Sequence, residues 1–131
     1  MVMMGNIVIR PANPNDWQVI QKLNDEVIRD NAQYDIDTIV DYSSTPTAVE
    51  YYIKVVSDSK YSCFIAWIDN KPVGYITGVA HEFDYRKSKY AELCDMGVSP
   101  ELRSKGVGKV LFHAFKDWAK KQGFQKIYVF S

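Results

Sequence analysis

The 131-residue sequence predicts an α+β fold in which helices flank a mixed, mostly antiparallel sheet. Two stretches of helix-period apolar residues occupy the first half of the chain, and runs of β-forming residues fill the middle. A strand–helix–strand unit closes the sequence, and a right-handed crossover would make its two strands parallel. The predicted order is β-α-α-β-β-β-α-β, in a single domain covering residues 1–131.

The first half predicts one strand and two helices. Residues 1–6 suggest a frayed end, and a short strand over 6–10 stops at Pro11. Asn13 and Pro14 predict a helix start, because Asn caps a first turn and proline suits the first helical position. The helix ends near residues 30–31. Its apolar face is Val19, Ile20, Leu23, Val27 and Ile28. Residues 43–46 predict the start of a second helix, with a buried stripe of Val49, Tyr52, Ile53 and Val56.

The second half predicts a hairpin and the closing unit. Strands over 61–68 and 72–83 flank the turn residues 69–71. Gly74 and Gly78 inside the second strand suggest a bulge or a close backbone approach. A strand over 90–98, a helix over 107–122 that Gly123 caps, and a strand over 127–130 follow. The helix stripe is Val107, Val110, Leu111, Ala114, Phe115 and Trp118.

The composition argues against several classes of function, namely nucleic-acid binding, membrane insertion and metal binding. Lys plus Arg and Asp plus Glu both count 16, so no net charge favours nucleic-acid binding. No segment has the apolar length of a membrane span, and no signal peptide opens the chain, so a cytoplasmic location is expected. Cys63 and Cys94 lie in strand-like runs and are expected to be reduced thiols. Two histidines and no zinc-type spacing predict no metal site.

The loop between the predicted strand over 90–98 and the predicted helix over 107–122 gives the clearest indication of a binding function. Residues 103–108 read Arg-Ser-Lys-Gly-Val-Gly and precede an amphipathic helix, so several backbone N–H groups can converge on an anion. The loop does not match the nucleotide P-loop motif. That motif requires Ser or Thr after Gly-Lys, where this chain has Val110, and a glycine five residues before Gly108, which is missing. The loop does not match the dinucleotide-binding motif of the Rossmann fold either, because Leu111 occupies the position of its third glycine.

This loop resembles the phosphate-binding motif of the GNAT superfamily of N-acetyltransferases, Arg/Gln-x-x-Gly-x-Gly/Ala. Arg103, Gly106 and Gly108 occupy its fixed places. The resemblance extends through almost the whole chain. It includes residues 9–12 (Ile-Arg-Pro-Ala), 69–75 (Asp-Asn-Lys-Pro-Val-Gly-Tyr), 96–101 (Met-Gly-Val-Ser-Pro-Glu), 123–124 (Gly-Phe) and 127–129 (Ile-Tyr-Val).

The resemblance implies a GNAT-like fold and acetyl-CoA as the cofactor. The loop would bind the pyrophosphate, and the pantetheine arm would pair with the preceding strand. The thioester would lie near a splay between strands 92–98 and 126–130. The cofactor-binding residues implied are Met96, Gly97, Val98, Arg103, Ser104, Lys105, Gly106, Val107, Gly108 and Lys109.

Glu92 is the candidate catalytic residue, because some members of this family carry a general base at the matching position. An amine must lose a proton before it attacks a thioester. Without a bulge, Glu92 would share a strand face with Met96 and Val98, and Asp95 would face the other way. A surface glutamate is the alternative interpretation. Cys94 has no histidine placed to activate it, so a covalent acyl-enzyme is not expected.

Acids and tyrosines near two loops could line an acceptor pocket for a cationic amine, although solvated loop charge is the more common explanation for such residues. The candidate residues are Glu26, Tyr34, Asp35, Glu82 and Tyr85.

The chain departs from the family at its end. Members usually continue with a helix and two strands, including a tyrosine that often serves as general acid. The sequence ends at Ser131, and no tyrosine takes that role by motif. The alternatives are a truncated chain, a natural short form, and a dimer that completes the sheet with its partner's strands. The exposed sheet edge favours the homodimer. The predicted reaction is direct acetyl transfer from acetyl-CoA to a primary amine. A non-catalytic acyl-CoA-binding module is the alternative.

Overall fold

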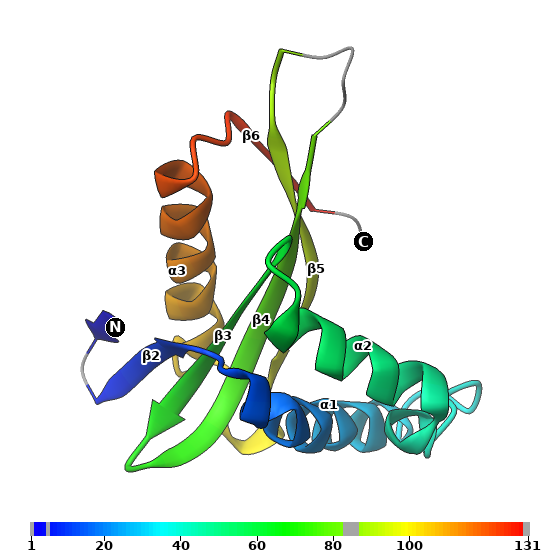
Figure 1. The fold of residues 1–131 in the computed structure, drawn as a ribbon. Helices are drawn as coiled ribbons and strands as arrows, with labels where there is room; N and C mark the ends of the chain where they lie inside the picture. The colour runs from blue at the N-terminus through cyan, green and yellow to red at the C-terminus, as the bar shows by residue number, and fades with distance from the viewer. Residues whose placement is uncertain (1, 5, 83–86, 130–131) are drawn as a thin grey trace.

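A computed structural model describes residues 2–4, 6–82 and 87–129. Six strands form one sheet in the order β1-β2-β3-β4-β5-β6 (Figure 1). All neighbours pair antiparallel except β5 and β6, which are parallel. The α+β class and the parallel closing unit are therefore confirmed. The strands are β1 (Val2–Met4), β2 (Ile7–Pro11), β3 (Tyr61–Ile68), β4 (Lys71–His81), β5 (Tyr90–Val98) and β6 (Lys126–Val129).

The prediction of a frayed N-terminus is wrong. Residues 2–4 form β1, which pairs with β2 in the register Val2 with Ile9 and Met4 with Ile7. A three-residue strand carries too little periodicity to be recognised in a sequence, and its partner strand supplies the hydrogen bonds that hold it.

The helices begin where the capping residues predict. Asn13 and Asp16 form a capping box at a short 3-10 turn that runs into α1 (Trp17–Asn31). Thr45 caps α2 (Pro46–Ser57), and α3 (Val107–Lys121) ends before Gly123. The stripe predicted for α2 is partly wrong, since Ile53 is exposed. The buried residues of α2 are Ala48, Tyr52 and Val55.

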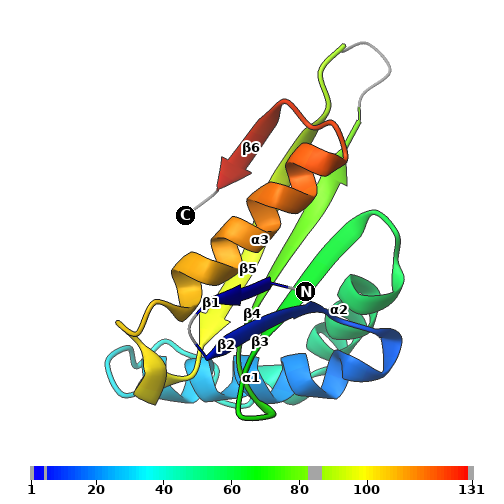
Figure 2. The same ribbon diagram turned by 90° about the vertical axis from the view of Figure 1, so that its left-hand side faces the viewer.

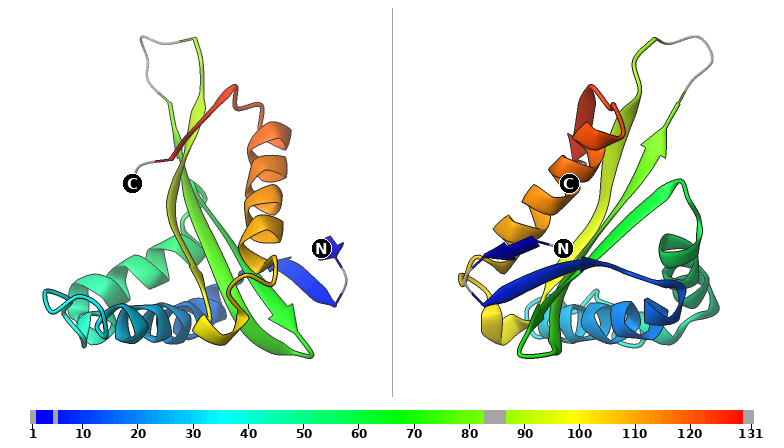
Figure 3. Two further views of the ribbon diagram at one scale, coloured as in Figure 1. Left: turned by 180° about the vertical axis from the view of Figure 1, so that it is seen from behind. Right: turned by 60° about the vertical axis from the view of Figure 1, so that its left-hand side comes forward.

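The sheet has two differently covered faces. Helices α1 and α2 lie on one face and α3 lies on the other, as Figures 1 and 3 show. The core on the α1–α2 face includes Ile20, Tyr52 and Tyr75. The core on the α3 face includes Leu111 and Phe115. Helix α3 runs diagonally across its face of the sheet (Figure 2).

Gly78 lets α3 approach the sheet closely, as its position in a strand suggested. A Cβ at this residue would stand 2.2 Å from Phe115 Cε1 and 3.0 Å from the Glu92 carbonyl oxygen. Real Cβ atoms do not approach other atoms so closely, so only glycine fits under Phe115.

A bulge interrupts the ladder between β4 and β5. Thr77 pairs with Asp95, but its neighbour Gly78 pairs with Leu93, which leaves Cys94 as an extra residue. The side-chain alternation therefore changes phase at Cys94. The prediction that Glu92 shares a face with Met96 and Val98 is wrong, and so is the prediction that Asp95 faces away from Glu92. Both acids lie on the α1–α2 face.

Both cysteines are free thiols. Cys63 belongs to the core on the α1–α2 face, and Cys94 is half-buried. No helix among residues 2–4, 6–82 and 87–129 is long and apolar enough to cross a membrane.

Candidate active site

A pocket of about 610 Å³ opens beside the bulge, between β5 and the helices of the α1–α2 face. Its volume is typical of small-molecule sites. The bulge region supplies Glu92, Cys94 and Asp95, and the rest of the wall combines polar groups with aliphatic and aromatic surface. The other lining residues are Asn24, Ile28, Asp37, Thr38, Ile39, Tyr42, Tyr51 and Tyr52.

Glu92 is held by a neighbouring imidazole. Its Oε1 lies 2.9 Å from His81 Nε2, and the His81 ring stacks on Tyr90 with centroids 4.9 Å apart. The Glu92 side chain is 29% exposed, so its carboxyl is partly shielded but still reaches the pocket. A carboxylate in this position can accept a proton from a ligand in the pocket.

Asp95 ends a chain of buried hydrogen bonds. The Tyr52 hydroxyl donates to Asn24 Oδ1, and Asn24 Nδ2 donates to the Tyr75 hydroxyl over 2.9 Å. The Tyr75 hydroxyl then donates to Asp95 Oδ2 over 2.6 Å. Each link fixes the next, so the network orients the Asp95 carboxyl at the pocket wall.

Burial shapes the protonation of the pocket wall. It raises the pKa of the Asp95 carboxyl above its ordinary value, although the Tyr75 hydroxyl and the Met96 N–H favour the charged form. Burial also raises the pKa of the Cys94 thiol to about 11, with nearby Glu92 and Asp95 adding to the effect. Cys94 is therefore a neutral thiol at pH 7, which argues against a nucleophilic role.

The loop before α3 offers an unused set of backbone donors. Within the described ranges, the backbone N–H groups from Ser104 to Lys109 have no hydrogen-bond acceptor. Ser104 (φ 65°) and Gly106 (φ 88°) adopt left-handed backbone conformations that curl the loop at the start of the helix. Converging N–H groups at a helix N-terminus favour an anion such as a pyrophosphate.

Two side-chain contacts tie this loop to α1. Arg103 Nη1 lies 2.5 Å from Asp30 Oδ2, and Ser99 Oγ donates to Glu26 Oε2 over 2.8 Å. Glu26 thus supports the loop, and it is not among the residues that line the pocket. Arg103 is 45% exposed in its side chain, so it remains accessible to a second anionic partner.

The edge of β5 connects the loop with the pocket. Strand β6 pairs with β5 only from Tyr90 to Leu93. Over residues 94–98, no described strand covers this edge. Gly108 faces the side chains of this edge, since a Cβ there would contact Met96 Cε at 3.7 Å and Val98 Cγ2 at 3.9 Å. An extended amide arm can pair with such an edge.

The other predicted acceptor residues do not gather at the pocket. Tyr34 is 83% exposed, and Asp35 accepts the N–H of Asp37 in an exposed turn. Glu82 forms an exposed ion pair with Lys89 and lines a different pocket. Tyr85 lies outside the described residues.

Sequence reasoning missed most of the pocket wall. Asn24 follows Leu23 and sits four residues after Ile20, and an amide beside a buried stripe signals a polar partner inside the fold. The bulge also left a trace. The apolar residues Ala91 and Leu93 have odd numbers, whereas Met96 and Val98 have even ones, so the period-2 pattern changes phase between them.

Comparison with protein families gives one assignment. The model described as "Acetyltransferase (GNAT) family" matches residues 24–131, which include the pocket wall from Asn24 onward and the whole loop. A search of curated proteins finds no significant match.

Solved structures share the fold. An aminoglycoside acetyltransferase from an uncultured soil metagenomic sample, in complex with sisomicin, superposes with a TM-score of 0.76 at 24% identity, covering 96% of this chain and 78% of that one. A ribosomal-protein-alanine N-acetyltransferase from Brucella melitensis biovar Abortus 2308 gives 0.70 at 16% identity, with coverage of 95% and 79%. AAC(6')-Iy, in complex with the bisubstrate analog CoA-S-monomethyl-acetylneamine, gives 0.73 at 18%, with coverage of 95% and 79%.

Proposed function

The chain belongs to the GNAT family of N-acetyltransferases, and on this basis we propose that it transfers the acetyl group of acetyl-CoA to a primary amine. One observation carries the proposal: the uncovered edge of β5 over residues 94–98 joins the donor-rich loop to the pocket that contains Glu92. A loop that can bind an anion, a strand edge that can pair with an extended arm, and a carboxylate that can accept a proton thus follow one another along β5. Acetyl transfer from a CoA thioester to an amine would use them in this order.

The residues present fit the cofactor. The N–H groups from Ser104 to Lys109 would bind the pyrophosphate, with Arg103, Lys105 and Lys109 adding positive charge. Met96, Gly97 and Val98, on the part of β5 that β6 leaves unpaired, would pair with the pantetheine arm. When bound, acetyl-CoA supplies the acetyl group as a thioester.

Glu92 would act on the acceptor. We assign it the role of general base that takes a proton from the substrate ammonium, directly or through one water. The freed amine forms the new C–N bond as the C–S bond breaks. A proton that the nitrogen still carries passes to the leaving thiolate, so the sulfur departs as the thiol. His81 holds the Glu92 carboxyl at the pocket wall.

The acceptor is proposed to be a small cationic amine. Glu92, Asp95 and Asp37 line the pocket, and together they favour positive charge. Tyr42, Tyr51 and Tyr52 add aromatic surface to the wall, which suits an ammonium. Aminoglycosides, the substrates named for the similar enzyme from a soil metagenomic sample, meet this description.

We also propose a cytoplasmic homodimer. Strand β6 forms the last strand of the sheet within the described residues, and Val129 on it is 59% exposed. An apolar residue at an uncovered edge favours pairing with another chain. A single species of monomer mass in sedimentation at micromolar concentration would contradict the dimer.

A coupled assay tests the proposed reaction. Release of free thiol is followed with acetyl-CoA and a panel of polyamines, aminoglycosides, amino acids and peptides, beside calorimetric titration of CoA. We expect micromolar CoA binding and turnover confined to cationic amines. CoA binding without turnover of any amine would favour the non-catalytic acyl-CoA-binding module, and absence of CoA binding would overturn both functions.

A further inference from the structure

Glu92 must lose one proton in every turnover of the reaction proposed above, and the inference that follows rests on that reaction. A primary ammonium carries three protons. The amide product keeps one, the leaving thiolate takes one, and Glu92 takes the third. The amine and the cofactor occupy the acceptor pocket during the reaction and exclude water from it. A route for this proton on another side of Glu92 is therefore favoured.

The His81 imidazole is in direct contact with the Glu92 carboxyl. His81 Nε2 lies 2.9 Å from Glu92 Oε1, which is within hydrogen-bond distance. Histidine can take up a proton at one ring nitrogen and release one at the other, and it does both near neutral pH. A proton can therefore pass from Glu92 to His81 without movement of either side chain.

Aromatic stacking keeps the imidazole in this position. The His81 ring stacks on Tyr90, with centroids 4.9 Å apart and planes inclined by 26°. Tyr90 in turn packs edge-on against Tyr128, with centroids 4.6 Å apart. The three rings come from the neighbouring strands β4, β5 and β6. Their contacts hold the imidazole within reach of Glu92, which a proton transfer requires.

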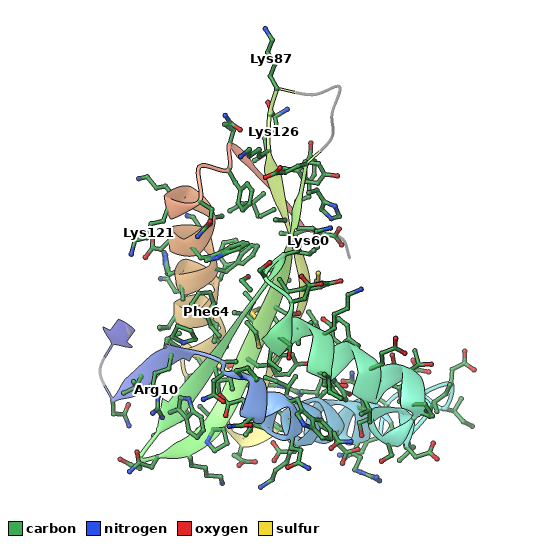
Figure 4. The ribbon with its side chains drawn as sticks, in the orientation of Figure 1. Arg10, Lys60, Phe64, Lys87, Lys121 and Lys126 are labelled. Atoms are coloured by element: carbon green, nitrogen blue, oxygen red, sulfur yellow. The ribbon has the colours of Figure 1, made fainter. Side chains whose placement is uncertain are left out.

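A second pocket connects His81 with the solvent. It has a volume of about 630 Å³ and is formed by the end of α2, the start of β3 and the end of β4. It shares no lining residue with the acceptor pocket. Lys60, labelled in Figure 4, lies beside β4 here, and its carbonyl oxygen accepts the N–H of Ala80 over 2.8 Å. His81 lines this pocket, and its side chain is 32% exposed.

The lining of the second pocket suits water. Its charged residues beside His81 are Lys54, Lys60, Asp58 and Glu82, so groups of both signs face the imidazole. Polar space of this volume holds water molecules that hydrogen-bond to such groups. Water there can accept a proton from the imidazole and pass it to the bulk solvent.

We propose that His81 carries the substrate proton from Glu92 to the water of the second pocket. Glu92 takes the proton from the ammonium, and His81 accepts it at Nε2. The other ring nitrogen then releases a proton to water, and exchange with water returns the ring to its starting tautomer. The products are the amide, the thiol and one proton in the solvent, so the protons balance. His81 acts through Glu92 and does not touch the substrate.

Single-turnover and steady-state rates separate this relay from a purely structural role. Thiol release is followed by stopped flow in dilute buffer, with acetyl-CoA and the amine of the assay panel that the unchanged protein acetylates fastest. His81→Gln keeps an N–H that can donate to Glu92, but the amide cannot carry a proton. We expect the first equivalent of thiol to appear within about twofold of the normal rate, because Glu92 begins unprotonated. The steady-state rate should fall about tenfold, because Glu92 then loses its proton slowly.

Chemical rescue gives a second readout. Imidazole added to His81→Ala can enter from the second pocket, and it should raise the steady-state rate about fivefold without changing that of the unchanged protein. Sodium chloride at equal ionic strength should not do so. His113→Gln, which changes the other histidine of the chain on the exposed side of α3, is the matched control and should keep both rates. An unchanged CoA affinity by calorimetry would show that each variant folds.

Three outcomes would overturn the relay. The first is an equal loss of the single-turnover and steady-state rates in His81→Gln, which would leave His81 with a structural role alone. The others are an unchanged steady-state rate in this variant and a failure of imidazole to raise the rate of His81→Ala. Absence of any turnover by the unchanged protein would instead contradict the proposed function, and the relay with it.

Discussion

The two faces of the central sheet use opposite packing strategies. On the α3 face, glycine in β4 lets Phe115 rest directly on the strand, and the core there is apolar. On the α1–α2 face, Asn24, Tyr75 and Asp95 form a hydrogen-bonded network inside the core. The first face achieves close contact, and the second keeps polar groups in fixed positions beside a pocket.

One extra residue in β5 decides which of its side chains lie on each face of the sheet. The bulge at Cys94 places Glu92 and Asp95 on the same face, although an uninterrupted strand would put them on opposite faces. The acids therefore meet at the acceptor pocket, while Leu93 and Val98 pack with the α3-face core. The bulge in β5 therefore determines that apolar side chains pack on the α3 face while both acids line the pocket on the α1–α2 face.

The largest expected effect comes from breaking the close contact on the α3 face. Gly78→Ala places a methyl group 2.2 Å from Phe115 Cε1, and the fully buried ring has little room to move. We expect a loss of about 3 kcal/mol in the free energy of unfolding, measured by urea denaturation.

Gly108→Ala is the control for this variant, because its new Cβ meets nothing closer than 3.7 Å. Its stability should stay within about 1 kcal/mol and lean toward stabilisation, since alanine suits a helix better than glycine. Equal losses in both variants would contradict the role given to Gly78.

Replacing Glu92 tests the proposed role of the α1–α2 face in catalysis. Glu92→Gln keeps the size of the side chain but cannot take a proton from the amine. We expect kcat/KM to fall about 100-fold and the rate to lose its rise with pH. Glu101→Gln, which changes an exposed glutamate near Lys71, should leave both unchanged. A normal pH–rate profile in Glu92→Gln would remove this residue from the mechanism.

Breaking the buried network has a smaller effect on stability. Tyr75→Phe leaves Asn24 Nδ2 and Asp95 Oδ2 without their shared hydroxyl, and we expect unfolding to become easier by about 2 kcal/mol. Tyr34→Phe removes an exposed hydroxyl and should change stability by less than about 0.5 kcal/mol. If thermal unfolding gives the same melting temperature for both variants, the network contributes nothing.

The smallest effect concerns the pH dependence of stability. Burial raises the pKa of Asp95 above the 3.8 of an unperturbed aspartate, so the folded state binds this proton more tightly than the unfolded chain does. Its stabilising contribution is complete below that value and is lost as the pH rises through the folded-state pKa.

Asp95→Asn removes this loss, and its amide oxygen can still accept from Tyr75. The variant should therefore gain stability relative to the unchanged protein as the pH rises from about 3, below the ordinary aspartate pKa, to about 7, as denaturation at each pH would show. A constant difference across this range would show that Asp95 is not perturbed by burial.

The sequence predicted the elements well and the site only in part. Capping at Asn13 and Thr45, the hairpin turn at Asp69 and Asn70, and the donor-rich loop depend on local residues, so they could be recognised. The pocket depends on which side chains meet across distant segments. Tyr52 and Asp95 are brought together through Asn24 and Tyr75, and a single sequence does not show such contacts.

Helix α1 takes part in both halves of the site. Asn24 and Ile28 line the acceptor pocket, while Glu26 and Asp30 hold the loop before α3. A ligand that shifts this helix at one half therefore changes binding at the other. Thermodynamic linkage makes the effect reciprocal, so the factor by which a loop ligand alters amine affinity equals the factor by which the amine alters loop affinity. The ion pair between Asp30 and Arg103 and the hydrogen bond between Ser99 and Glu26 are the contacts that join this helix to the loop.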